Sequence, residues 1–160
     1  MSALLETPQA GGPARAMSRG SRRQYEATFD VVAEDLATVR SIVRGHLRWW
    51  RAGEDTVDRV LFAVNELLTN VLEHTAPDDS GRRQADILVQ RVPGGVTAVV
   101  RDSDPSPLER RNARPLDESG RGLALVRALV DESSVSKTDA GKDVWFFVAD
   151  QESEGRTEEP

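Results

Sequence analysis

The stretch that decides the fold is residues 54–74, which read EDTVDRVLFAVNELLTNVLEH. Its apolar residues recur every three to four positions, and this spacing predicts a long amphipathic helix; they are Val57, Val60, Leu61, Val64, Leu67, Leu68 and Val71. At about 100° per residue, Glu66, Asn70 and Glu73 fall within about 60° of one another, opposite that apolar face. The helix should therefore pack on one side and present two carboxylates and a carboxamide on the other.

The segments around this helix complete an α+β pattern. Alternating or continuous apolar runs predict strands, and longer periodic runs predict helices. We expect a strand at Tyr25–Asp30, a helix at 35–51, a hairpin of strands at 85–92 and 96–101 that turns at 93–95, a long loop at 103–119, a helix at 121–130, and strands at 133–137 and 143–149. Because hairpins dominate, the fold should be a two-layer sandwich, in which a mixed but mainly antiparallel sheet carries three helices on one face.

Length and composition fit a single domain of 160 residues, 38% of them hydrophobic. Residues 1–22 are expected to be disordered and residues 151–160 to form an acidic disordered tail, which leaves 23–150 as the folded domain. The net charge of −6 disfavours nucleic-acid binding, and no apolar run approaches the length of a membrane span. The absence of cysteine excludes disulfides and fits a cytoplasmic protein.

The polar face of the long helix is a candidate metal-binding and catalytic site. An asparagine carbonyl oxygen suits Mg²⁺, which keeps several waters and takes few protein ligands, so Asn70 is the candidate magnesium ligand. Glu66, one turn earlier, could orient or deprotonate a hydroxyl. The alternative is a helix face that only meets water, and spacing alone favours it. Asparagine is a poor residue for the middle of a helix, which counts against that alternative.

Two further motifs follow along the chain. Asp102 comes at the end of a strand, where a carboxylate can accept a hydrogen bond from an exocyclic amine such as that of adenine; an ordinary turn aspartate is the alternative. Gly120-Arg121-Gly122 leads into a helix at Leu123, and a glycine turn at a helix N-terminus favours phosphate, although it can also serve the turn alone. Neither the dinucleotide-binding fingerprint nor the P-loop is matched. Each motif is weak alone, but together and in this order they predict an ATP site.

These motifs, on these elements, resemble the ATPase superfamily of gyrase, Hsp90, histidine kinases and MutL. Within it, the chain is similar to small bacterial anti-sigma factors of the actinobacterial type that are also serine-protein kinases. The resemblance runs from Tyr25 to Ala149, and four strings carry it: NELLTN at 65–70 with His74-Thr75, RDSDP at 101–105, GRGLALV at 120–126 and GKDVW at 141–145. It implies a Bergerat-type ATP-binding, kinase-like domain over residues 23–150.

The resemblance also implies roles for the site residues. Asn70 would bind the Mg²⁺ that bridges the ATP phosphates, Glu66 would act as general base or orient a seryl hydroxyl, and Asp102 would bind the adenine amine. Phosphate would be held by the glycine turn and the helix it opens, that is by Gly120, Arg121, Gly122 and the amide of Leu123. The loop at 103–119 would be a lid over the nucleotide.

The implied partners are a sigma factor, an antagonist protein that is phosphorylated on serine, and a second copy of the chain. The homodimer would form partly through the strand Tyr25–Asp30, which would otherwise be an unpaired sheet edge. A nucleotide-binding partner module without kinase activity is the alternative. A histidine kinase is disfavoured, because no helical hairpin with a phospho-acceptor histidine precedes the domain.

The chain departs from the superfamily pattern in two places. Asp104 and Ser106 stand where glycines usually follow the aspartate. The contact expected before the final strands can be assigned to either Thr138 or Lys142.

Overall fold

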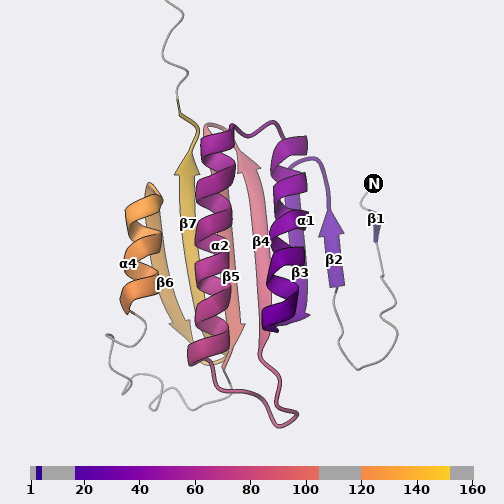
Figure 1. Ribbon diagram of the computed structural model, residues 1–160, viewed down its shortest axis with the longest axis vertical. Coiled ribbons are helices and arrows are strands. Elements are labelled where there is room, and N and C mark those ends of the chain that lie inside the picture. Colours follow the sequence, from indigo (N-terminus) through magenta and orange to yellow (C-terminus); the bar gives the residue numbers. More distant parts are fainter. Residues whose placement is uncertain (1–2, 5–16, 105–119, 152–160) are drawn as a thin grey trace, which may run out of the picture.

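A computed structural model describes residues 3–4, 17–104 and 120–151 of the chain (Figure 1). Its elements follow in the order β1 (Ala3–Leu4), β2 (Met17–Gly20), β3 (Gln24–Asp30), the 3₁₀ turn η1 (Ala33–Asp35), α1 (Leu36–Trp49), α2 (Glu54–His74), β4 (Gln84–Val92), β5 (Gly95–Ser103), α4 (Gly120–Leu129), β6 (Glu132–Thr138) and β7 (Gly141–Ala149).

The described strands form one sheet in the order β1-β2-β3-β4-β5-β7-β6, and each described pairing in it is antiparallel. Helices α1, α2 and α4 all lie over the same face of this sheet, with α2 in the middle (Figure 1). The predicted α+β two-layer sandwich is therefore confirmed.

Helix α2 has the bounds that its sequence predicts. It begins after Gly53, which is extended, and it ends before Thr75, which is extended as well. The preceding helix α1 already ends at Trp49, and Arg51 with φ 58° turns the chain toward α2. The apolar stripe of α2 packs on alternate residues of the central strands, among them Ile87 of β4 and Phe146 of β7, both almost fully buried. The core between the two layers thus fixes how α2 is rotated over the sheet. None of the described helices is long and apolar enough to cross a membrane.

The expected disorder of residues 1–22 is wrong for Ala3–Leu4, which form β1 and pair with β2, and for Met17–Gly20. Met17–Gly20 form β2 and pair with β3, whose edge would otherwise carry unpaired backbone groups. The indole Nε1 of Trp50 donates to the carbonyl of Ser21 at 3.0 Å and holds the following turn against α1. Strand β3 is consequently internal to the sheet, so the argument that it serves as a free dimerisation edge fails. The expectations for residues 5–16 and 152–160 lie outside the described ranges.

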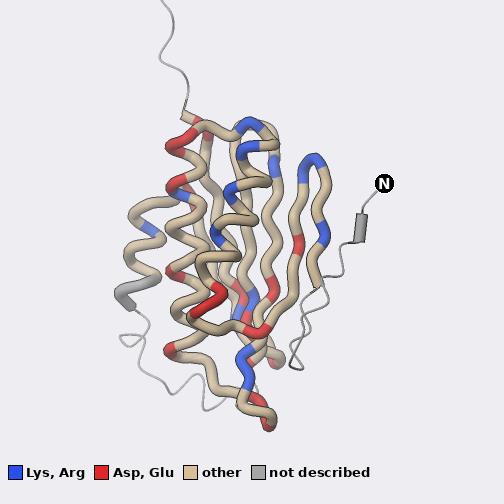
Figure 2. The backbone as a smooth tube through the Cα atoms, turned by 45° about the vertical axis from the view of Figure 1, so that its right-hand side comes forward, with Lys and Arg blue, Asp and Glu red and all other residues tan. Residues whose placement is uncertain are grey.

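Charges of both signs share the helical layer (Figure 2). Arg40, Arg44 and Arg48 recur at four-residue spacing along α1. Acidic groups close by offset them in part, since Arg48 lies 3.5 Å from Glu54 at the start of α2. The arrangement agrees with a chain of modest negative net charge.

Candidate functional site

The elements that carry the predicted motifs meet at one end of the molecule. Figure 1 shows the C-terminal end of α2, the end of β5 and the starts of β7 and α4 at the same end. Because β5 and β7 are antiparallel, the last residues of one lie opposite the first residues of the other: Asp102 pairs with Lys142 and Ser103 with Gly141. The fold therefore brings together motifs that are far apart in the sequence.

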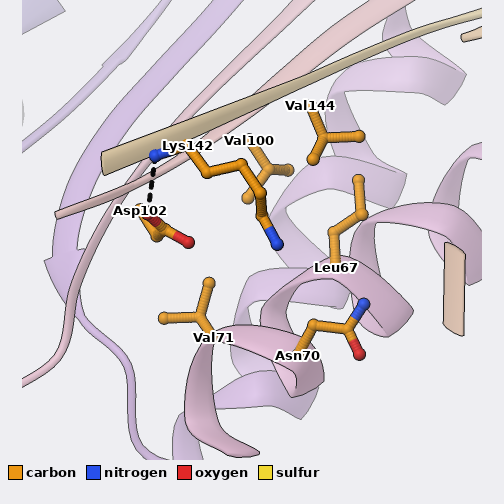
Figure 3. Close-up of a pocket in the computed structure, with 7 residues that line it drawn as sticks. All are labelled: Leu67, Asn70, Val71, Val100, Asp102, Lys142 and Val144. Atoms are coloured by element: carbon orange, nitrogen blue, oxygen red, sulfur yellow. Dashed lines mark hydrogen bonds between the residues drawn. The ribbon is translucent and has the colours of Figure 1, made fainter. Parts of the chain in front are cut away.

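A small pocket lies between α2 and the ends of these two strands (Figure 3). Its lining is apolar except for a carboxylate, a carboxamide and an ammonium group; the residues are Leu67, Asn70, Val71, Val100, Asp102, Lys142 and Val144. The cavity volume is about 10 Å³, room for about one water molecule.

Asp102 is a fixed hydrogen-bond acceptor at one side of this pocket. It lies within β5 rather than after it, and it is only 7% exposed. One carboxylate oxygen accepts the backbone N–H of Lys142 at 2.8 Å, and the other accepts the hydroxyl of Thr75 at 3.2 Å. Burial raises the pKa of Asp102, and the two donors together with the charge of Lys142 partly offset that rise. A carboxylate has about four acceptor sites, so capacity remains for a further donor.

Two neighbours keep Asp102 in place, and sequence reasoning did not give them this role. Thr75 is 5% exposed, and its carbonyl accepts Nε of Arg83 at 2.7 Å. Gly141 has φ +156°, and a Cβ there would meet the carbonyl of Asp102 and come within 2.7 Å of its Oδ1. Only glycine allows β7 to start this close to Asp102. A threonine directly after a helix end and a glycine before a strand were the available signals.

Asn70 differs from its prediction in burial. The sequence places it on the solvent-facing side of α2, but it is only 7% exposed and lines the pocket with Leu67 and Val71. The reason is that α2 lies in the middle of the layer, between α1 and α4, so that these helices and the sheet cover more than one face of it (Figure 1). The Nδ2 atom of Asn70 is buried and has no hydrogen-bond partner among the residues that the structure describes. Such a group costs about 1–3 kcal/mol, which suggests a polar group kept for a ligand.

The donor set around Asn70 fits a magnesium ion that arrives with a ligand. Its carboxamide can offer one oxygen, and the described residues include no cluster of three acidic or histidine side chains. Mg²⁺ accepts such a site when phosphate oxygens and waters supply the other ligands.

Glu66 lies one turn before Asn70 on α2, partly exposed and outside the pocket lining. Glu66 and Asn70 are therefore one turn apart on α2, but Asn70 is buried in the pocket and Glu66 is partly accessible to solvent. A general base that accepts a proton from a substrate hydroxyl has to be accessible to that substrate, and Glu66 meets this condition.

The glycine turn opens α4 as predicted. This helix starts at Gly120, and Leu123 in its first turn packs on the core. Its other end is tied to α2, because Arg59 donates to the carbonyl of Leu129 at 2.7 Å and pairs with Asp131 at 3.0 Å. The side chains of residues 120–122 and the whole of 105–119 lie outside the described part. The loop expected at 103–119 is therefore described only at Ser103, which ends β5, and at Asp104.

Comparison with known proteins gives one family. The model of the histidine kinase-like ATPase domain matches residues 29–148. A search of curated protein sequences gives no match.

Two solved structures match this chain. The RsbU and RsbW domains of Rv1364c from Mycobacterium tuberculosis match with a TM-score of 0.62 at 21% identity, over 79% of this chain and 32% of that one. The histidine kinase domain of a blue-light activated histidine kinase from Erythrobacter litoralis EL346 matches with a TM-score of 0.49 at 22% identity, over 72% of this chain and 59% of that one. This chain thus spans about a third of the length of the mycobacterial chain.

Proposed function

The chain belongs to the family of histidine kinase-like ATPase domains, and we propose that it is a cytoplasmic anti-sigma factor that binds ATP with Mg²⁺ and phosphorylates a serine of an antagonist protein. The proposal of a nucleotide-binding site rests on one observation. Asp102, held by two donors, faces the same pocket as Asn70, whose buried Nδ2 has no partner within the described part of the chain.

The base of the nucleotide would bind at Asp102. Its carboxylate already receives the Thr75 hydroxyl and the Lys142 amide, and both fix its orientation. The exocyclic amine of adenine supplies the kind of donor that the remaining acceptor sites take. The apolar walls formed by Val71, Val100 and Val144 suit the faces of a purine ring.

The phosphates would lie between α2 and the start of α4. Asn70 would hold Mg²⁺ through its carboxamide oxygen, and the bound ion would neutralise phosphate charge. The backbone at Gly120 and Gly122, the amide of Leu123 and the side chain of Arg121 would contact phosphate at the positive end of the helix dipole.

Glu66 would serve the transfer step. The seryl oxygen forms a bond to the γ-phosphorus as the bond to the ADP oxygen breaks, and Glu66 accepts the seryl proton or orients the hydroxyl. Phosphoryl transfer needs mainly positioning and charge neutralisation, so a partly exposed carboxylate is sufficient for this role.

The partners rest on the motif resemblance to anti-sigma factor kinases, with support from the fold of the mycobacterial RsbU and RsbW domains. They are a sigma factor, a serine-containing antagonist and a second copy of the chain. Because β2 covers β3, a homodimer would use a surface other than the Tyr25–Asp30 edge.

The second candidate function is a nucleotide-binding module without kinase activity. It is favoured by the unusual polar groups at the base end, where Asp104 is 5% exposed and its charge raises the pKa of Asp102. Incubation of γ-labelled ATP with the chain and a candidate antagonist separates the two. The kinase proposal expects phosphoserine with the parent chain and its loss with Glu66→Gln. ATP binding without phosphoryl transfer would support the nucleotide-binding module, and absence of ATP binding would refute both candidate functions.

A further inference from the structure

Lys142 lies at the centre of the pocket that we assign to the base. It is the second residue of β7 and lies directly opposite Asp102, and cross-strand partners point to the same face of a sheet. Figure 3 shows its side chain running from the strand into the space between Asp102 and the α2 residues Leu67 and Asn70. The Lys142 side chain therefore occupies space in a pocket whose remaining cavity volume is about 10 Å³.

The surroundings explain why the side chain lies inward. Its carbon stem passes the apolar side chains of Val100, Val144 and Leu67 (Figure 3). Lysine can bury its stem in this way while the ammonium stays near a charge or water. Here the positive charge of Lys142 acts on the Asp102 carboxyl and lowers its pKa against the effect of burial.

The cavity has room for about one water, whereas a purine is many times larger. We propose that the Lys142 side chain competes with the base for this pocket and must swing out before a nucleotide binds, so that it sets the affinity of the site. The inference rests on the proposed nucleotide function and adds to it a residue that limits occupancy.

Displacement of the side chain leaves the acceptor intact. Asp102 is held by the hydroxyl of Thr75 and by the backbone N–H of Lys142, and neither bond depends on the ammonium. Lys142 is partly exposed at the start of its strand, so a rotated side chain reaches solvent without movement of the backbone. The adenine base would then contact the apolar side chains that the carbon stem of Lys142 contacts in its absence.

Two alanine variants test the competition. Lys142→Ala should bind ATP·Mg²⁺ about fivefold more tightly, since the attraction between the partly exposed Lys142 charge and the Asp102 carboxylate, which is lost when the side chain swings out, contributes up to about 1 kcal/mol. Lys137→Ala is the matched control: it removes the same charge from the exposed neighbouring position on β6, and its affinity should be unchanged or slightly lower. Titration calorimetry gives both constants, and thermal melting confirms that each variant is folded. Equal or weaker binding by Lys142→Ala would overturn the competition.

Amine labelling gives an independent readout, because the chain has only two lysines, Lys137 and Lys142. With a small acylating reagent and peptide mass spectrometry, labelling of Lys142 should rise when saturating ATP·Mg²⁺ is added, relative to Lys137. Protection of Lys142 would show instead that it contacts the nucleotide, which contradicts the proposal. If ATP binds neither the parent nor Lys142→Ala, the proposed function itself fails; if ATP binds both equally, only the competition fails.

Discussion

Replacement of Asn70 by alanine should make the ligand-free protein more stable while it removes Mg²⁺-dependent ATP binding. The Nδ2 atom of Asn70 is buried, none of the described residues 17–104 and 123–151 hydrogen-bonds to it, and the position is in the interior of α2. A group retained for a ligand carries such a cost in the unliganded state. A structural asparagine would show the opposite pattern.

The magnitude follows from three contributions. Removal of an unpartnered buried donor gains about 1–3 kcal/mol, and the lower end applies because the pocket has room for about one water near it. Alanine is a better helix former than asparagine by about 0.5 kcal/mol. The packing lost with the truncated side chain offsets about 1 kcal/mol of this. The free energy of unfolding should therefore rise by about 0.5–1 kcal/mol.

Urea unfolding and ATP titration on the same preparation test this prediction. Asn65→Ala is the control on the same helix, because the Asn65 carboxamide oxygen accepts Nη1 of Arg40 at 2.6 Å and so joins α2 to α1. The control should lose about 1 kcal/mol and keep ATP binding. If Asn70→Ala unfolds more easily than the parent and still binds ATP with the parental affinity, Asn70 is structural and the reasoning is wrong.

Four further predictions follow from the same contacts. Thr75→Val removes a donor from a buried carboxylate and should lower the free energy of unfolding in urea at neutral pH by about 1.5–3 kcal/mol. The control Thr28→Val breaks a comparable bond to Asp86 on the open sheet face, so it should cost less and leave ATP binding unchanged. Equal costs for the two variants would refute the role of Thr75. Gly141→Ala should lose about 2–3 kcal/mol and weaken ATP binding, because its Cβ would displace Asp102; parental stability would contradict this. Glu66→Gln should keep ATP binding but slow phosphotransfer by about 10²–10⁴-fold in a labelled-ATP assay, and a parental rate would remove Glu66 from the mechanism. Burial raises the pKa of Asp102 in the folded state, so the contribution of this group to stability is fully present below the usual aspartate pKa of about 3.9 and is lost as pH rises through the raised value. Asp102→Asn should therefore flatten this part of the curve of unfolding free energy against pH. An unchanged slope would exclude Asp102 as the source of the pH dependence.

Local sequence predicted the elements of this fold well because their patterns are strong. The apolar stripe of 54–74 and the glycine on its N-terminal side define α2 without tertiary information. The hairpin β4–β5 follows in the same way from two apolar runs around Pro93-Gly94-Gly95. Strand β2 has no such pattern, since Met17–Gly20 becomes a strand only because β3 offers it an edge.

The candidate site was predicted residue by residue but not as an arrangement. Motif order identified Asn70 and Asp102, yet helical spacing alone assigned Asn70 to solvent, because coverage by neighbouring elements is a tertiary property. The contacts of Thr75 and Gly141 with Asp102 likewise depend on the pairing of β5 with β7. Lys142 was one of two possible contacts, and only the strand register places its side chain in the pocket.

The central claim is that the pocket between α2, β5 and β7 is a site for ATP and Mg²⁺. Titration calorimetry of the parent chain with ATP, in the presence and absence of Mg²⁺, tests it most directly. The account predicts saturable binding of one ATP per chain that is strengthened by Mg²⁺, and loss of the Mg²⁺-dependent part in Asn70→Ala. No binding at millimolar ATP, or binding that neither Mg²⁺ nor Asn70→Ala alters, would contradict it.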